Sequence, residues 1–278
     1  MHEGPPYAGG MLILLPPSEG KTAPRSGAPL DLDALALADA DGVTSARREL
    51  LARLAEVSAR DDAATLLGVG ASLADEVAAN TRLDSAPAAP ARRVYTGVLF
   101  EALGLASLSP AARRRAGTDV LISSALFGAT TPADRVPAYR LPIGARLPDL
   151  PGLAAWWRPV LAPALDAHAA SRGGPVVDCR SGGYAAQWRA PAERTLTVDV
   201  FQLRGGEPTV VSHHAKHTRG LVARALLEAG PRAAGTLERA ADVVARAGAA
   251  DGPHAWEVDL VPPTGRRPGS LRVVLPEG

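Results

Sequence analysis

Short apolar runs alternate with longer amphipathic stretches along the chain, a pattern that predicts strands and helices in turn. Proline or glycine flanks the apolar runs at 12–15, 120–128 and 175–179, and we expect each run to form a buried strand. A β-hairpin is predicted at 195–203 and 208–214, and terminal strands at 255–261 and 270–275. Helical spacing of apolar residues predicts helices at 153–170, 216–229 and 236–247. Because strands and helices interleave, the predicted class is α/β, with one mixed sheet in a single globular domain over 11–278.

A mainly helical region is expected at 30–85, followed by a Pro/Ala linker at 80–91. Within it, residues 67–74 (LGVGASLA) place Gly68 and Gly70 between two helical patterns, where glycine permits a tight turn. This spacing fits a helix-hairpin-helix motif, whose second helix points its N-terminal N–H groups at a DNA phosphate. A plain packing corner between two helices fits the same residues. Farther along, the proline-rich residues 129–152 are expected to wrap the surface without regular structure.

The first ten residues, MHEGPPYAGG, predict a disordered extension, so the fold proper is expected to begin at Met11. They lack the basic start and the apolar stretch of a signal peptide, and no apolar run reaches the ~18 residues that a membrane span needs. A single cysteine, Cys179, suits a reducing compartment and is interpreted as a core residue. The expected location is the cytoplasm. A monomer is favoured, although the oligomeric state stays open.

The nearly neutral net charge of the chain indicates that any anion-binding site is local. The formal net charge of the 278-residue chain is only +1, so no overall field would draw the protein to nucleic acid or to a membrane. Nearly all of its 30 basic residues are arginine, and its two lysines are Lys21 and Lys216. A lysine retained against this bias indicates a need for a compact or deprotonable ammonium. Chance retention on a solvated surface is the alternative.

Lys21 ends a stretch, MLILLPPSEGKT, that looks like a phosphate-binding P-loop. The P-loop spacing requires a glycine five residues before Gly20, and that position is Leu15. Two prolines also remove N–H groups from the loop, which a phosphate cradle needs. The P-loop is therefore excluded, while Ser18 and Lys21 stay candidates for contacts with a phosphate or a base.

Basic residues gather in SHHAKHTRG, residues 212–220. Lys216 and Arg219 near a helix N-terminus would bind phosphate, and a solvated basic turn is the alternative. His213 and His217 have a spacing that metal ligands use on helices, but no carboxylate or cysteine close in sequence completes a set. No metal is expected, and the roles of these two histidines and of His214 stay open.

Two further stretches carry polar residues. DCRSGGY, 178–184, follows a predicted strand, where open α/β sheets bind ligands. Its Ser181 does not fit the G-x-S-x-G pattern of a nucleophile elbow. In PAYRLP, Tyr139 and Arg140 offer a planar set of donors or hold the loop in place.

Together these stretches resemble the YaaA family of peroxide stress proteins. The segments that carry the resemblance are MLILLPPSEGKT, VYTGVLFEALG, LISSALFGATTPADRVPAYRLPIGARLP, the WW helix, VVDCRSGGYAAQW and HHAKHTRGLVARALL. They occur in the family's order and cover most of residues 11–230. The resemblance implies a mixed α/β body with a positively charged cleft and a helix-hairpin-helix element that binds duplex DNA. It also implies a cytoplasmic role in limiting iron-driven oxidative damage.

Carried over by position, the resemblance implies a set of motif residues. They are Lys21, Tyr95, Gly97, Gly128, Tyr139, Arg140, Ser181, Tyr184, Lys216, Arg219 and Gly220. Apart from Gly97, Gly128 and Gly220, these are the expected phosphate- or DNA-binding residues, together with Ser18, Gly68 and Gly70. The chain departs from the family pattern at two acidic positions, which are Pro142 and Gly183 here.

Two functions are compatible with these residues. The first is a DNA-binding protein of the peroxide stress response, whose cleft holds a phosphate or a base. The second is an enzyme acting on a nucleotide, a nucleobase or damaged DNA in the manner of a glycosylase or lyase. Lys21 would serve it as a Schiff-base amine or electrostatic clamp, with Lys216 as a second catalytic candidate. No cofactor is expected, and the partner is double-stranded DNA or a nucleotide-like anion.

Overall fold

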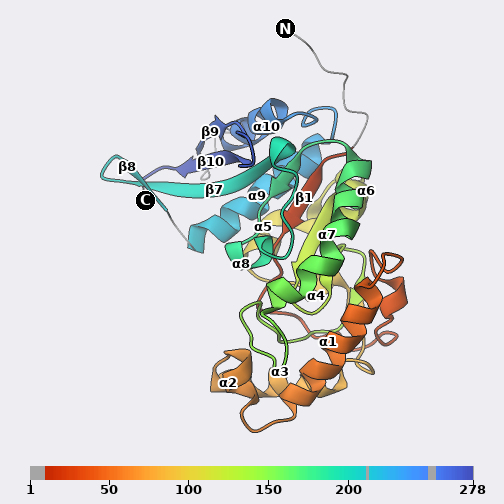
Figure 1. The fold of residues 1–278 in the computed structure, drawn as a ribbon. Coiled ribbons are helices and arrows are strands. Elements are labelled where there is room, and N and C mark those ends of the chain that lie inside the picture. The colour runs from red at the N-terminus through yellow and green to blue at the C-terminus, as the bar shows by residue number, and fades with distance from the viewer. Residues whose placement is uncertain (1–9, 211–212, 250–254, 278) are drawn as a thin grey trace.

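The computed structural model describes residues 10–210, 213–249 and 255–277. In this part of the chain eight strands form one mixed sheet, in the order β4-β3-β1-β6-β7-β10-β9 with β8 paired to β7 (Figure 1). The strands are β1 (Leu12–Leu15), β3 (Val120–Ser124), β4 (Gly128–Thr130), β6 (Val176–Asp178), β7 (Thr195–Arg204), β8 (Glu207–Val210), β9 (Glu257–Val261) and β10 (Gly269–Leu275). The predicted α/β class with a mixed sheet is confirmed. The expected extension at 1–10 lies, except for Gly10, outside the described residues.

Strand β1 lies between β3 and β6 and is parallel to both. Ile13 is the register partner of Val120 on one side and of Val177 on the other. The chain passes from β1 to β3 through α6 (Pro110–Asp119) and from β3 to β6 through α7 (Leu153–Arg172). Because β3 and β6 flank β1 on opposite sides, the carboxyl end of β1 is a topological switch point, the usual place for a ligand in an open α/β sheet.

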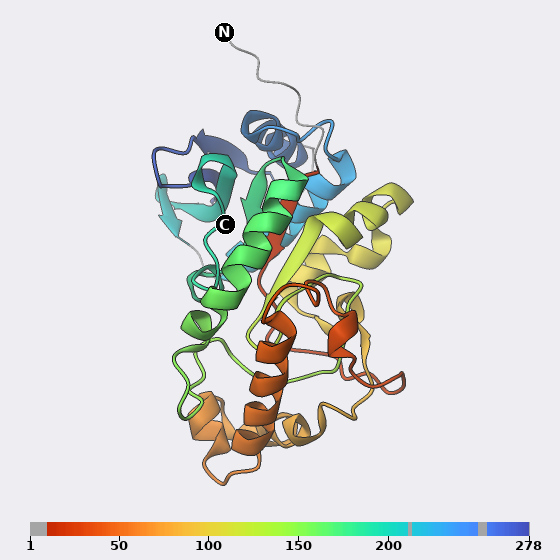
Figure 2. The same ribbon diagram turned by 45° about the vertical axis from the view of Figure 1, so that its right-hand side comes forward.

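Helices cover both faces of the sheet (Figures 1 and 2). This explains why β1 is an unbroken apolar run, since all four of its residues are buried. α7 covers one face, and on the other α9 (His213–Ala229) packs against α5 (Val98–Leu103), α6 and β7. The close approach of α5 and α9 requires Gly220, because a Cβ there would lie 2.3 Å from the carbonyl oxygen of Leu99.

A helical layer lies below the sheet in Figure 1. Its longest helix, α1 (Val43–Ser58), is fixed to the sheet by the fully buried Arg47. The Arg47 guanidinium donates to the carbonyl oxygens of Phe127 and Ala129 at 3.0 Å each, and to that of Ala36 at 2.7 Å. The other helices of the layer are η1 (Leu32–Ala34), α2 (Ala63–Leu67), η2 (Ala71–Leu73), α3 (Ala74–Ala79) and η3 (Asn80–Arg82).

Three expectations about local structure need correction. Residues 213 and 214 begin α9 and do not belong to the hairpin, whose second strand is described over Glu207–Val210. Residues 80–91 are not a free linker, because they contain η3 and β2 (Ala89–Pro90), and Asn80 is fully buried. The proline-rich segment includes β4 and β5 (Arg135–Val136), which pairs with β2.

The helices expected at 153–170, 216–229 and 236–247 are confirmed as α7, α9 and α10 (Leu237–Ala249). The remaining helices are α4 (Ala91–Val94), η4 (Leu105–Ser107), α8 (Gly182–Ala185) and η5 (Ala192–Arg194). No helix in the described ranges is long and apolar enough to cross a membrane.

Candidate ligand-binding cleft

A cavity of about 280 Å³, here called the cleft, lies at the carboxyl end of β1. Four segments line it: the loop after β1, the start of α5, the segment after β6 and the first half of α9. The polar side chains of its wall are Ser18, Glu19, Thr96, Ser181, Tyr184, Lys216 and Arg219, and the apolar ones are Pro16, Pro17, Val98, Leu99 and Phe100. The cleft therefore coincides with the switch point of the sheet.

Ser18 holds the loop after β1 in place. Its hydroxyl donates to the carbonyl oxygen of Gly20 at 2.5 Å and accepts from the backbone N–H of Thr96 at 3.0 Å. The Thr96 hydroxyl donates to the same carbonyl oxygen at 3.3 Å. These bonds fix the loop against the residues that precede α5. Because the Ser18 hydroxyl already donates its proton to Gly20, that proton is used within the loop.

Lys21 lies just beyond this loop, on an aromatic platform. Its Nζ donates to the carbonyl oxygen of Ser18 at 2.9 Å, and lies 4.2 Å from the ring centroid of Tyr139 and 5.6 Å from that of Tyr95. An ammonium so close to an aromatic face is attracted by the ring quadrupole. Burial lowers the pKa of Lys21 to about 8, Glu19 opposes this shift and Arg140 adds to it. A substantial share of Lys21 is therefore neutral near pH 8.

A chain of hydroxyl groups holds the two rings of the platform. The Tyr95 and Tyr139 oxygens are 3.0 Å apart, and the Tyr139 oxygen is 2.7 Å from the Ser124 hydroxyl. Ser124 accepts from two backbone N–H groups, of Leu126 and Phe127, so its own proton is directed to Tyr139. Burial raises the pKa of both phenols, which therefore stay neutral at physiological pH.

Arg140 joins the helical layer to the cleft. Its side chain is 7% exposed and pairs with Glu76 of α3, with the Glu19 carboxylate 3.6 Å from Nη1. Its backbone is clasped by Asn80, which accepts from the Arg140 N–H at 2.9 Å and donates to the Arg140 carbonyl at 2.8 Å. This clasp explains the complete burial of Asn80 in what the sequence presents as a linker.

The cations of α9 lie in the wall of the cleft. Lys216 is exposed, and no carboxylate within the described chain forms an ion pair with it. Arg219 uses Nε to donate to the carbonyl oxygen of Val198 at 3.0 Å, which orients its guanidinium. Ser181 and Tyr184, from the segment after β6, share the cleft with these cations. Burial raises the pKa of Tyr184, so its phenol is a neutral hydrogen-bonding group.

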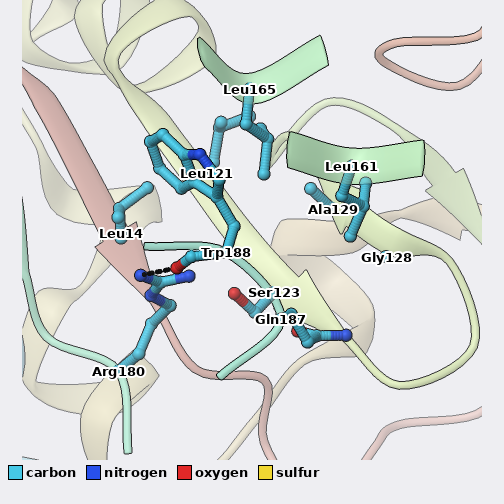
Figure 3. Close-up of a pocket in the computed structure, with 10 residues that line it drawn as sticks. All are labelled: Leu14, Leu121, Ser123, Gly128, Ala129, Leu161, Leu165, Arg180, Gln187 and Trp188. Atoms are coloured by element: carbon cyan, nitrogen blue, oxygen red, sulfur yellow. Dashed lines mark hydrogen bonds between the residues drawn. The ribbon is translucent and has the colours of Figure 1, made fainter. Parts of the chain in front are cut away.

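A much smaller cavity lies between the sheet and α7 (Figure 3). Its volume of about 10 Å³ suits one water molecule at most. Arg180 closes one side and donates to the carbonyl oxygen of Trp188 at 2.9 Å (Figure 3). The same guanidinium pairs with Asp178 at 2.7 Å. Gln187 donates to the carbonyl oxygen of Ser124 at 2.9 Å, so this cavity adjoins the support of the tyrosine platform.

A protein-family model described as "Peroxide stress protein YaaA" matches residues 11–243. The chain belongs to the YaaA family. It is 43% identical to a UPF0246 protein of Streptomyces coelicolor over 273 residues, which cover 96% of this chain and 99% of the relative. A UPF0246 protein of Corynebacterium efficiens is 40% identical, over 86% of this chain and 93% of the relative. The family resemblance of the sequence is confirmed.

The structure of this YaaA-family protein separates the expected site residues into three groups. Ser18, Ser181, Tyr184, Lys216 and Arg219 line the cleft. Lys21, Tyr95, Tyr139 and Arg140 form the adjoining cluster. Gly68 and Gly70 belong to neither, because they form an exposed turn of the helical layer. Glu19, Glu76, Asn80, Thr96 and Ser124 also belong to this neighbourhood but were not predicted as site residues. Glu19 stands inside the motif PPSEGKT and could have been found there.

The turn at Gly68 and Gly70 connects two short helices. Gly68 ends α2 with a φ of 65°, a left-handed conformation that favours glycine, while Gly70 has an extended backbone. The neighbouring Leu66 carbonyl accepts from the Arg146 N–H at 2.9 Å, which fixes the turn to the proline-rich segment. The local shape is thus a helix, a glycine turn and a second helix.

The two departures from the family pattern lie close together in this YaaA-family protein. A Cβ at Gly183 would come within 2.9 Å of the side chain of Ile143, the residue after Pro142. Pro142 and Gly183 stand where the family resemblance implies carboxylates. This chain has neither, and any proton transfer in its cleft has to use other groups.

Proposed function

We propose that this protein binds DNA during peroxide stress and limits iron-driven damage to it in the cytoplasm, with the cleft holding a phosphate or a base. Family membership supports the stress role. The observation that carries the binding role is the pair of α9 cations, Lys216 and Arg219, in a cleft at the switch point of the sheet. Such cations suit phosphate oxygens, and a local site is what a net charge of +1 allows.

The glycine turn is proposed as a second contact with duplex DNA. It is exposed, and the 3-10 helix η2 begins directly after Gly70, where free N–H groups at a helix start could meet a phosphate. A contact of this kind positions the duplex without reading its sequence. The proposal therefore predicts DNA binding with little sequence preference.

Duplex binding measured by fluorescence anisotropy tests this function. We expect log K to fall linearly with log salt, by about 0.9 per phosphate neutralised, and with few contacts because the net charge is small. Ser72→Glu, an exposed change in the turn, should weaken binding by repelling phosphate. Ser45→Glu adds the same charge at an exposed position of α1 and serves as the control.

Unchanged affinities of the variants for duplex DNA would contradict the proposed DNA contacts. If Ser72→Glu, Lys21→Ala and Lys216→Gln all bind duplex as the wild type does, neither the turn nor the cleft contacts DNA. Circular dichroism of each variant establishes that it is folded before its affinity is compared.

A second candidate function is an enzyme that acts on a nucleotide, a nucleobase or damaged DNA through Lys21. The supporting observation is an amine with a pKa of about 8 beside the cleft. A neutral amine attacks the aldehyde of an abasic site, and loss of water forms an imine. Borohydride reduces that imine to a stable amine, so the DNA becomes linked to the protein.

Borohydride trapping separates the two functions. With only two lysines in the chain, peptide mass spectrometry assigns the link to Lys21 or Lys216 directly. The lyase version predicts trapping on Lys21 that is abolished in Lys21→Arg. Absence of trapping across several damaged substrates would rule that version out while leaving DNA binding intact.

A further inference from the structure

The wall of the cleft has two chemically different parts. Lys216 and Arg219 are three residues apart on α9, so they share one face of that helix. Pro16 and Pro17 of the loop, with Val98 and Phe100 of α5, supply an apolar part. A ligand that fills this cleft therefore combines an anionic group with a flat or apolar body.

The volume of the cleft and the charge of its lining further limit which ligands it can hold. A volume of about 280 Å³ is at the small end of the sites that hold small molecules, which span roughly 300–1,000 Å³. The charged side chains that line the cleft are Glu19, Lys216 and Arg219, and they sum to one positive charge. One phosphate suits this balance, whereas a triphosphate would bring several negative charges toward Glu19.

Resting on the proposed function, we propose that the cleft binds a single nucleoside monophosphate unit. Its phosphate lies on Lys216 and Arg219, with the Ser181 hydroxyl as a further donor. Its nucleoside packs against the apolar wall at Pro17 and Phe100. Glu19 accepts hydrogen bonds from hydroxyl or amino groups of the nucleoside, because a carboxylate is an acceptor only.

This chemistry has two possible sources, a free nucleotide and one nucleotide of a DNA strand turned out of its stack. Calorimetric titration distinguishes them. The probes are inorganic phosphate, a nucleoside, nucleoside 5′-monophosphates, a nucleoside triphosphate, a perfect duplex and a duplex with one unpaired nucleotide. For a free-nucleotide site, we expect the monophosphate to bind at least about tenfold more tightly than phosphate, nucleoside or triphosphate.

Variants assign the site to the cleft. Lys216→Gln and Arg219→Gln should each weaken monophosphate binding by about tenfold or more, since each removes a charged hydrogen bond. Arg239→Gln, which removes an exposed arginine on α10, should leave it unchanged. The exposed position of Lys216 makes Lys216→Gln the variant least prone to misfold.

The outcomes separate the nucleotide site from DNA binding. If only the duplex with an unpaired nucleotide binds more tightly than the perfect duplex, and Lys216→Gln removes that gain, the unit comes from a DNA strand. If perfect duplex binds while monophosphates and the unpaired nucleotide give no gain, the nucleotide site is wrong and DNA binding stands. If monophosphates bind and duplex does not, DNA binding is wrong and the nucleotide site stands.

Discussion

The Nζ atom of Lys21 lies 4.2 Å from the ring centroid of Tyr139, and the hydroxyl of that ring is fixed by Ser124 at 2.7 Å. The amine is thus held by the carbonyl oxygen of Ser18 on one side and by an immobile aromatic face on the other. Its ammonium form keeps the attraction of the ring but loses most of its hydration.

We predict that the Lys21 amine loses its proton at a lower pH than an exposed lysine does. Because burial lowers its pKa to about 8, acylation of Lys21 by an amine-reactive ester should reach half its maximal rate near pH 8. Peptide mass spectrometry resolves Lys21 from Lys216 in the same sample. A rate for Lys21 that rises only above pH 10 would show that its amine is fully hydrated.

The stability of Lys21→Met should depend on pH. Between pH 8 and 10.5 the unfolded chain binds more protons at Lys21 than the folded protein, so wild-type stability rises with pH through this window. The lysine therefore costs most below pH 8, by at most about 3 kcal/mol before the cation–π attraction offsets part of it. Urea unfolding should show Lys21→Met to be the more stable protein at pH 7, with a smaller difference at pH 10. An equal difference at both pH values contradicts the burial of this amine.

Tyr139→Phe should destabilise the protein by about 1–3 kcal/mol, because it leaves the buried Tyr95 and Ser124 hydroxyls without a shared partner. The ring beneath Lys21 remains, so the apparent pKa of Lys21 should change little. Tyr139→Leu removes the ring as well, and should alter both unfolding and the Lys21 titration. Identical unfolding curves for wild type and Tyr139→Phe would show that the hydroxyl chain adds no stability.

Cys179 should not respond to peroxide in the folded protein. It is fully buried, and burial raises the pKa of its thiol to about 12, so the reactive thiolate is scarce at neutral pH. Mass spectrometry after treatment with hydrogen peroxide should find the thiol unmodified until urea unfolds the chain. Rapid formation of a sulfenic acid in the native protein would instead make this residue a peroxide sensor.

The glycine turn allows a matched comparison. Gly68→Ala should cost about 1 kcal/mol, since its φ is 65°, whereas Gly70→Ala has a backbone that alanine adopts freely. Thermal unfolding of the two variants should show a lower midpoint for Gly68→Ala only. Equal midpoints would indicate that the turn relaxes at no cost.

The strands of the sheet and the helices that cover it could be predicted, because the pattern of apolar residues that indicates each of them is local in sequence. The apolar run at 12–15, and the helices over 153–170 and 216–229, follow from periodicity alone. Segments stabilised by distant partners gave weaker signals. Asn80 stands in a Pro/Ala-rich stretch, and its partners Ser58 and Arg140 are distant in sequence, Arg140 by sixty residues.

Most residues of the candidate site could be predicted from the sequence, but not which of them line the cleft and which form the adjoining cluster. The scarcity of lysine singled out Lys21 and Lys216 together, yet of these two only Lys216 lines the cleft, while Lys21 lies over the tyrosine rings. Ser124 was missed because its hydroxyl matters only through the Tyr139 oxygen, a contact between separate segments. A sequence shows which residues are unusual, and the fold decides which of them meet.

A crystal structure of the protein soaked with a nucleoside 5′-monophosphate tests the central claim most directly. The account predicts the phosphate within hydrogen-bonding distance of Lys216 and Arg219, with the base against the apolar wall at Phe100. A cleft that stays without nucleotide at saturating concentration, or a phosphate bound at another surface, would contradict it.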